Sequence, residues 1–353
     1  MKKQSLFLLA LVGLFFGACD PGQEVTSKVE QSINMDDFYV YTEDQDNHAH
    51  KTTAGKKDRV CSSMRVLNEK LKQNPALEKK MYDIELHTRK MAAETMKGKP
   101  GSGGGGGGTP TDDGLGTITI PVYVHVIYSN SQENISDAQI NSQIAVLNKD
   151  FSKTNSDINQ VPSEFAGVAA DADIQYTLAG VTRKASSRAE WGTRDDMKKA
   201  SMGGVNPITP ETHLNIWVCN IGGGILGYAQ FPGGSLSTDG VVVGPNYFGT
   251  TGYVSAPFDG GRTLTHEVGH YLNLRHIWGD GRCRQDDFVS DTPSSDSPNY
   301  GCPSYPTVKC KSNDMTMNYM DYVNDDCMYM FSEGQKSRMR ALFAAGGARE
   351  SMR

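Results

Sequence analysis

The chain has 353 residues, a formal net charge of -6 and a sequence pI of about 5.8. Hydrophobic residues make up 37% of it, charged residues 22%, and the mean hydropathy is -0.48. This length accommodates about two domains with a sizeable core. The acidic balance argues against a nucleic-acid partner, which a basic patch would indicate. The 7 cysteines cannot all pair with one another, because their number is odd.

The first 18 residues have the pattern of an export signal. A short basic start, MKK, precedes an apolar run at 6–16 that is too short to span a bilayer comfortably. The sequence FGAC at 16–19 is similar to a bacterial lipobox, in which the cysteine becomes the lipid-bearing first residue, although leucine is usual at the first position. We therefore expect a lipoprotein of the bacterial cell envelope, on the outer membrane or surface, whose contact with the membrane is a lipid on Cys19. Ordinary cleavage near Ala18, with Cys19 incidental, is the alternative.

Three segments of different composition follow the signal. Residues 19–58 are polar and irregular, which predicts a disordered tether. Residues 59–100 carry apolar side chains at helical spacing, and Pro75 separates two helices, which predicts a helical prosegment. Residues 101–116 contain a run of glycines and are predicted to form a flexible linker. This linker is the clearest domain boundary in the chain.

Beyond the linker, patterns typical of strands and helices alternate. Residues 117–128 are rich in β-branched side chains and predict a strand. Ser136 then caps a predicted helix that extends to Phe151. Shorter strands are expected at 173–179, 214–221 and 239–244, and helices at 263–273 and 332–345. Residues 277–330 are rich in Asp, Pro, Ser and Cys and show little periodicity.

Three histidines and a glutamate gather within residues 266–276. His266 and His270 are one helical turn apart, so both imidazoles project from one face and suit a tetrahedral Zn²⁺. His276 supplies a third ligand if the chain turns first, and Asn273 tolerates the left-handed conformation of such a turn. Glu267 can take a proton from a water that zinc acidifies, and three protein ligands leave the fourth position open for that water. A buried amphipathic helix with hydrogen-bonded histidines is the alternative.

A second segment, NYMDY at 318–322, follows the histidine helix. Together these residues resemble the pappalysin family of metzincin zinc metalloproteases, because HEVGHYLNLRH is similar to the family's HEVGHWLGLxH. IPVYVHVIY, HLNIWVCNI and SDTP are similar to that family as well. The resemblance covers essentially residues 117–345. It implies that Met320 lies beneath the zinc ligands as a Met-turn and that Tyr322 hydrogen-bonds the tetrahedral intermediate.

The resemblance implies an α+β fold with a two-lobed catalytic domain. The upper lobe, 117–276, would contain a twisted mixed sheet with helices, and the lower lobe, 277–353, would be mostly irregular and held by disulfides. Spacing alone leaves three pairings open for the four lower-lobe cysteines. The resemblance implies the pairs Cys283–Cys310 and Cys302–Cys327.

The acidic loop after the histidine helix is the next candidate site. The resemblance implies a structural Ca²⁺ there, and the ligands we name are Asp287, Asp291 and Thr292, since clustered oxygen atoms suit this ion. A solvated acidic loop is the alternative. Small bacterial members of the family favour a basic residue just after the scissile bond, which implies a carboxylate in the binding pocket. Asp325 and Asp326 are the candidates, unless they lie in solvent or bind calcium.

Cys61 lies just before the predicted prosegment helices. A thiolate is a strong zinc ligand, and from this segment it could fill the open position of the metal. This resembles the cysteine-switch prosegments of the family, with Ser62 where glycine is usual. If Cys19 carries lipid and Cys219 is packed in the core, Cys61 is the one cysteine left over. A free thiol or an intermolecular disulfide is the alternative.

These observations together predict an exported, monomeric zinc endopeptidase that is made as a latent zymogen and acts on proteins or peptides. Activation would require a cut in or near the linker, which would also release the enzyme from a lipid anchor. Two other functions remain open: a surface adhesin that keeps the fold without hydrolysis, and a zinc amidase acting on cell-wall peptides. The intact Glu267 weighs against a pure binding protein, which has no need of that carboxylate.

Overall fold

The computed structural model describes residues 33–42, 58–97 and 113–353. The predicted export signal, Cys19 and the glycine run at 103–108 lie outside the described residues. Residues 35–353 form one unit. Within the described ranges, no helix is both long and apolar enough to cross a membrane.

The regular elements follow the order that the sequence patterns predict. The helices are α1 (Ser63–Gln73), α2 (Ala76–Lys97), α3 (Asp137–Phe151), α4 (Ser163–Ala166), α5 (Arg262–Tyr271) and α6 (Glu333–Ala341). The strands are β1 (Ile118–Tyr128), β2 (Ile174–Ala185), β3 (Leu214–Val218), β4 (Gly227–Ala229), β5 (Val241–Val243), β6 (Val308–Lys309) and β7 (Ser312–Asn313).

The central sheet has five strands in the order β2-β1-β3-β5-β4. The first four strands in this order pair in parallel, and β4 pairs antiparallel with β5 at the edge. Along β1 the even-numbered residues from Ile118 to Val126 are buried in the main core, as expected for a strand whose side chains alternate between two faces. This twisted mixed sheet confirms the predicted α+β class.

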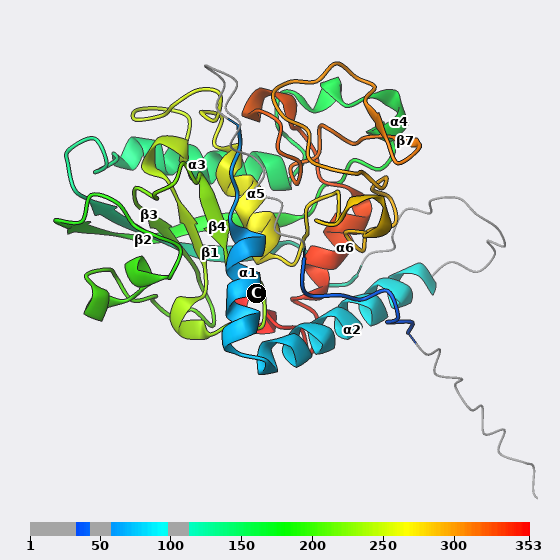
Figure 1. The fold of residues 1–353 in the computed structure, drawn as a ribbon, viewed down its shortest axis with the longest axis horizontal. Helices are drawn as coiled ribbons and strands as arrows, with labels where there is room; N and C mark the ends of the chain where they lie inside the picture. The colour runs from blue at the N-terminus through cyan, green and yellow to red at the C-terminus, as the bar shows by residue number, and fades with distance from the viewer. Residues whose placement is uncertain (1–32, 43–57, 98–112) are drawn as a thin grey trace, which may run out of the picture. The chain divides into compact units, whose positions relative to one another are not determined.

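Helices α3 and α5 lie on the same face of this sheet (Figure 1). Their apolar residues, among them Ile140, Leu147, Leu264 and Val268, share one buried cluster with the strands. Helix α3 begins as predicted, because the Ser136 side chain accepts a hydrogen bond from the backbone N–H of Gln139. Helix α5, which carries the first two histidines, is buried along its whole length. The core therefore holds the site helix on a rigid base.

Most of the chain after residue 276 is irregular and contains two disulfides. Cys283 pairs with Cys310 and Cys302 pairs with Cys327, which is the pairing that the family resemblance implied. Helix α6 closes this region with a capping box between Ser332 and Gln335. Because little regular structure is present, the cross-links supply order that a larger core would otherwise give.

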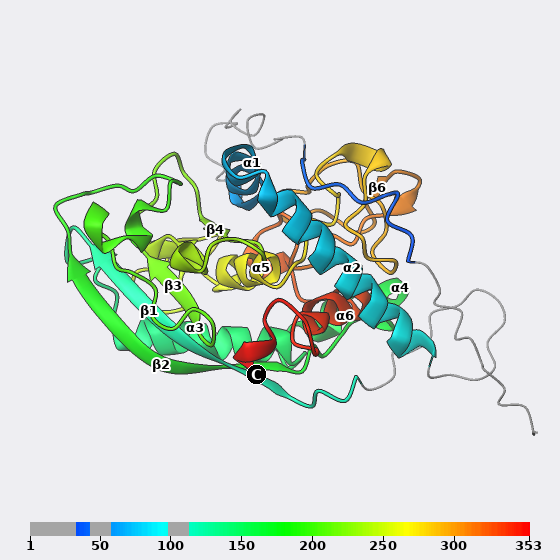
Figure 2. The same cartoon turned by 90° about the horizontal axis from the view of Figure 1, so that it is seen from below.

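The two prosegment helices pack against the rest of the unit, and α2 crosses α6 (Figures 1 and 2). Pro75 separates them, as predicted. The apolar face of this pair includes Met64, Leu67, Leu71 and Leu77, which form a buried cluster with Phe231 of the chain beyond the linker. The predicted prosegment is thus folded onto the part of the chain beyond the linker.

Part of the predicted disordered tether is ordered. Residues 35–42 pack against the rest of the unit. Val40 is buried in the prosegment cluster, and the Tyr39 hydroxyl lies within hydrogen-bond distance of the backbone oxygens of Gly279 and Asp286. The polar composition of 19–58 led to the prediction of disorder. The aromatic and apolar side chains at 38–40 nevertheless provide enough apolar surface to pack against the folded unit. Other differences are smaller: β2 continues six residues beyond the predicted end at 179, and the three-residue strand β4 was not predicted.

Candidate metal centre

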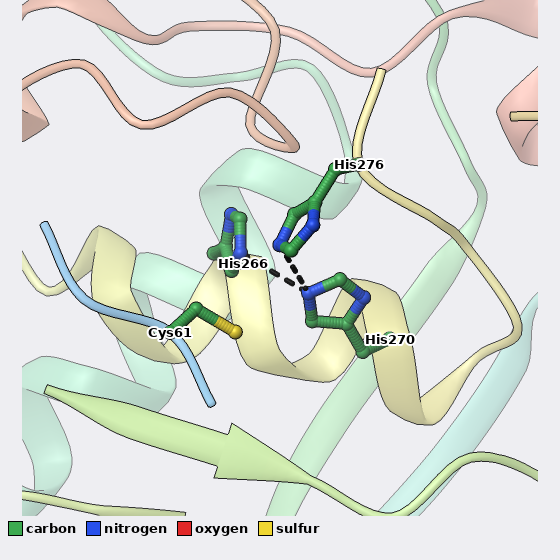
Figure 3. Close-up of side chains that lie close together, drawn as sticks. All are labelled: Cys61, His266, His270 and His276. Atoms are coloured by element: carbon green, nitrogen blue, oxygen red, sulfur yellow. Dashed lines mark hydrogen bonds between the residues drawn. The ribbon is translucent and has the colours of Figure 1, made fainter. Parts of the chain in front are cut away.

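Helix α5 and the turn after it bring three imidazoles together. The Nε2 atom of His270 lies 3.2 Å from that of His266 and 3.1 Å from that of His276 (Figure 3). All three side chains are buried. The spacing of one helical turn places the first two on the same face, and the following turn returns His276 to them.

The opposite ring nitrogen of each histidine is already held. His266 Nδ1 lies 2.7 Å from the backbone oxygen of Tyr319, and His270 Nδ1 lies 2.8 Å from that of Leu274. His276 Nδ1 lies 2.5 Å from the Asp280 carboxylate. Since these oxygens only accept, each Nδ1 carries the proton and each Nε2 presents a lone pair.

This arrangement fits a metal ion. Burial, followed by the neighbouring imidazoles, lowers the pKa of His266 and His270 well below the usual value, so both rings are neutral. Neutral lone pairs separated by 3.1–3.2 Å cannot hydrogen-bond to one another, whereas a cation between them satisfies all three. Three imidazoles are a donor set typical of catalytic zinc.

Two backbone features make the cluster possible. Asn273 has a φ of 72°, the left-handed conformation expected from the sequence, and it turns the chain between His270 and His276. Met320 is buried beneath α5, and a Cβ added to Gly269 would lie 2.4 Å from the Met320 sulfur. Gly269 therefore allows the segment that carries Met320 to approach the ligand helix closely.

Glu267 is buried beside the histidines. Its Oε2 accepts a hydrogen bond from the Ser63 hydroxyl at 2.8 Å and lies 3.5 Å from the Cys61 sulfur. Burial raises the pKa of this carboxyl to about 7, although the contacts from Ser63 and Cys61 act in the opposite direction. Both neighbours belong to the prosegment, so the carboxylate is covered in this form of the chain.

Cys61 completes a group of four metal-binding side chains. Its sulfur and one ring nitrogen from each of the three histidines all lie within 4.8 Å of one another. Figure 3 shows the Cys61 side chain pointing toward the imidazoles from the prosegment. Cys61 is buried and takes part in no disulfide. The same is true of Cys219, which lies in a second buried cluster of the core.

Arg59 enters the molecule two residues before Cys61. Its Nη2 lies 2.6 Å from Asp325 Oδ1, and both side chains are buried. The other oxygen of Asp325 accepts from the backbone N–H groups of Gly260 and Arg262, which fixes the carboxylate at the start of α5. Asp326, the second candidate from the sequence, is exposed. Of the two predicted carboxylates, Asp325 is therefore the one that faces a basic side chain.

Tyr322 lies close to the histidine cluster, as the sequence predicts. Its ring centroid is 4.9 Å from that of His276, and its hydroxyl donates to the backbone oxygen of Cys61 at 3.4 Å. The indole of Trp278 stacks on His276 at 4.3 Å between ring centroids. These aromatic rings border the imidazoles and hold the third ligand in place.

The predicted calcium ligands form two separate hydrogen-bonded groups. The Thr292 hydroxyl donates to the Asp287 carboxylate, 2.8 Å from Oδ1 and 2.9 Å from Oδ2. Asp291 instead accepts from the Ser332 hydroxyl and the Gly334 N–H at the start of α6. Asp287 is buried, and that burial raises its pKa well above the usual value.

Four residues of the site escaped sequence reasoning. Arg59, Ser63, Gly269 and Asp280 contact Asp325, Glu267, Met320 and His276 respectively. Arg59 carried a signal, because residues two apart in an extended segment project from the same side. Asp280 carried another, since it follows His276 by four residues. The contacts of Ser63 and Gly269 depend on segments that meet only in the folded chain.

Comparisons with known proteins agree with this geometry. Residues 209–344 match the model of the M43 peptidase family, described as pregnancy-associated plasma protein-A. An extracellular metalloprotease of Arthroderma benhamiae is 33% identical over 246 residues, covering 66% of this chain and 76% of that protein. Extracellular metalloprotease 1 of Coccidioides posadasii is 33% identical over 236 residues, covering 64% of this chain and 77% of that protein.

Solved structures give the same result. Mature mirolysin of Tannerella forsythia in complex with a cleaved peptide is 47% identical, with a TM-score of 0.66. The match covers 67% of this chain and 95% of the mirolysin chain. A promirolysin mutant of that organism is 40% identical, with a TM-score of 0.73, and the match covers 83% of this chain and 97% of the promirolysin chain. Together with the metal-binding geometry, these similarities lead to one conclusion: this chain belongs to the M43 or pappalysin family of peptidases and is a metalloendopeptidase.

Proposed function

We propose that this protein is an exported zinc endopeptidase, made as a latent zymogen, that cleaves proteins or peptides before a basic residue. The observation that carries the proposal is the convergence of three buried imidazoles beside Glu267, with the prosegment residues Arg59 and Cys61 seated on the same site. His266, His270 and His276 would hold the zinc. When bound, it supplies Lewis-acid activation for hydrolysis.

Glu267 is the general base in this proposal. Its carboxylate lies beside the histidine cluster, 3.5 Å from the Cys61 sulfur that belongs to the metal-binding group, which supports a role in moving a proton to and from a water at that position. Glu267 would accept a proton from the attacking water and then donate it to the leaving amine. The Tyr322 hydroxyl, which in the zymogen donates to the Cys61 backbone oxygen, would donate instead to the developing oxyanion.

The prosegment maintains latency in this proposal. Cys61 directs its sulfur at the metal position, while Ser63 covers Glu267 and Arg59 occupies the Asp325 carboxylate. A substrate cannot reach any of these groups until the segment leaves. Cleavage between the prosegment and the catalytic part, in or near residues 101–116, would permit its release. The match to promirolysin covers a larger share of this chain, 83%, than the match to mature mirolysin, 67%, which agrees with a prosegment of this kind.

Substrate preference is assigned to Asp325. The Arg59 guanidinium on this buried carboxylate supports a pocket for arginine or lysine just after the scissile bond, because a charged hydrogen-bonded pair of this kind is geometrically selective. Asp326 is not included, since it is exposed. The similarity to mature mirolysin, whose solved structure holds a cleaved peptide, supports a peptide substrate for the present chain as well.

The outer parts of the site are also proposals. Asp287 and Thr292 would contribute to a structural Ca²⁺ site, for which their adjacent side-chain oxygens offer ligands, with Asp291 at its margin. Residues 1–18 would direct export, with a lipid on Cys19, and the similarity to extracellular metalloproteases supports export. The catalytic lobes would be 117–276 and 277–353.

A protease assay on the chain without its predicted export signal tests this function. Residues 20–353 are incubated with casein and with peptides that carry Arg, Lys or Ala after the scissile bond, before and after limited proteolysis of the linker. We expect cleavage after activation, inhibition by a chelator, and a preference for Arg and Lys that Asp325→Ala abolishes. Bound zinc without any cleavage would instead favour the binding-protein function, and cleavage confined to cell-wall peptides would favour the amidase.

A further inference from the structure

A second basic side chain of the prosegment is held at a site distinct from Asp325. The Lys70 ammonium on α1 lies 2.7 Å from Asp195 Oδ2 and 2.6 Å from Gln230 Oε1. Two oxygen atoms from different parts of the catalytic region thus converge on one cation. This ion pair lies beside a cavity of about 690 Å³ between α1 and residues 193–199 and 230–238.

Both oxygens are positioned by residues that remain after the prosegment leaves. Asp195 Oδ1 accepts from the Tyr228 hydroxyl at 3.0 Å and pairs with the buried Lys198 ammonium at 3.0 Å. Gln230 Oε1 also accepts from the Thr238 hydroxyl at 2.8 Å, and its amide nitrogen donates to the Ser235 backbone oxygen. Release of Lys70 therefore leaves two fixed acceptors directed at the cavity.

The charge of this site is suited to one ammonium group. Burial alone would raise the pKa of Asp195, but the Lys198 and Lys70 ammoniums outweigh it and hold the pKa at about 2, so the carboxylate is ionised. Arg194 and Lys199 also line the cavity, so its field as a whole is not strongly negative. The recognition rests on two short contacts to a single nitrogen, a geometry that favours lysine over the planar arginine fork.

The site lies along the substrate path. The prosegment pairs with the edge strand β4, because Ser62 donates its N–H to the Gly227 oxygen and the Ala229 N–H donates to the Ser63 hydroxyl. Gln230 follows directly after β4. Arg59, at the other end of the paired segment, lies on Asp325 near the start of α5. The metal position thus falls between the two cation-binding sites.

We propose that, in the activated enzyme, Asp195 and Gln230 form a subsite for a lysine on the N-terminal side of the scissile bond. The inference rests on the proposed function, in which Asp325 binds the residue just after that bond. Helix α1 rises about 10 Å from Ser63 to Lys70, which an extended peptide covers in about three residues. The lysine would therefore lie about three to five residues before the bond.

A peptide series tests this subsite. The full chain is activated by cleavage and removal of the prosegment, and kcat/KM is measured for peptides with arginine after the scissile bond. Lysine is compared with the neutral norleucine at each position from two to six residues before the bond. We expect a lysine-to-norleucine ratio of about 10 at one position, which is the gain from a single charged hydrogen bond.

Variants then connect that ratio to the two oxygens. Gln230→Met removes one acceptor without stripping Lys198 of its counter-ion, and we expect the ratio to fall to about 2. Asp195→Asn is the second variant, with the same expectation. Thr193→Val is the matched control, since it changes an uncharged residue of the cavity lining and should keep the ratio. A ratio near 1 at every position, or one that both variants leave unchanged, overturns the subsite. Failure to cleave any peptide would instead count against the proposed function.

Discussion

Helix α5 and the prosegment segment 59–63 lie face to face, but their contacts differ in kind. The side chains of Leu264, Val268 and Tyr271 on α5 are buried in the main apolar core. The prosegment segment buries Val60 and Cys61 as well, but it adds polar contacts, with Arg59 on Asp325 and Ser63 on Glu267. The helix that carries His266 and His270 is therefore held by the apolar core, whereas the covering segment also depends on polar contacts that a substrate or water can replace.

This difference explains how latency and catalysis coexist in one chain. Because most of the apolar packing of α5 comes from the catalytic part of the chain, we expect the site to stay formed when the covering segment is removed. Polar contacts also provide selectivity, since each one needs a specific partner. The following changes alter one side of this comparison at a time, from the largest expected effect to the smallest.

Glu267→Gln should abolish catalysis while leaving the frame intact. Glutamine can still accept from Ser63, but it cannot take a proton from water, so we expect kcat/KM of the activated enzyme to fall by about 10³ to 10⁴. Peptide hydrolysis measures the loss, and metal content by mass spectrometry shows whether the histidine cluster survives. Glu211→Gln, at an exposed position, is the matched control. Retention of more than a tenth of the activity would remove Glu267 from the role of general base.

Arg59→Met should weaken the covering segment alone. The change leaves the buried Asp325 carboxylate without its guanidinium, at a cost of about 3–5 kcal/mol. We expect the full chain to activate itself at least ten times faster, followed as the appearance of the mature band. Arg65→Met is the control, because this half-buried arginine donates to the nearby Ser62 hydroxyl and, among the described residues, to no other group. Equal activation times for the two variants would show that the Asp325 contact does not restrain the prosegment.

Acid should loosen the docking of α2. Burial alone would raise the pKa of Glu85, but Arg338 and Arg89 outweigh it and hold the pKa at about 2, against 4.5 for the free group. A lowered pKa stabilises the folded form above about pH 4.5, and the contribution of roughly 3 kcal/mol is lost as the pH falls toward 2. The Tm difference between wild type and Glu85→Gln should therefore be largest at pH 5–7 and shrink below pH 4.5. A constant difference across this range would contradict the assignment.

The turn at Asn273 should show the smallest effect. Because its φ is 72°, Asn273→Gly is expected to change the free energy of unfolding by less than about 1 kcal/mol, while Asn273→Ala should lower it by about 1–2 kcal/mol. Urea unfolding of the metal-loaded full chain measures both. An alanine variant as stable as the glycine variant would mean that the left-handed turn is not required between His270 and His276.

The sequence by itself determined that three histidines converge, because helical periodicity places His266 and His270 on one face and Asn273 permits the turn to His276. It also predicted the α+β class, the break at Pro75 and, through family resemblance, both disulfides. These features depend on local geometry or on strong motifs. The ordered segment 35–42 and strand β4 were missed, since short elements in polar or glycine-rich surroundings leave little periodic signal.

Only the tertiary structure decided which groups meet the prosegment. Arg59 and Asp325 are separated by 266 residues, as Lys70 and Gln230 are by 160, and no local pattern indicates such partners. The sequence offered Asp325 and Asp326 as equal candidates, and burial at the start of α5 distinguished them. The physical reason is that a buried charge needs a partner from wherever the chain brings one, so long-range pairs follow from packing rather than from spacing.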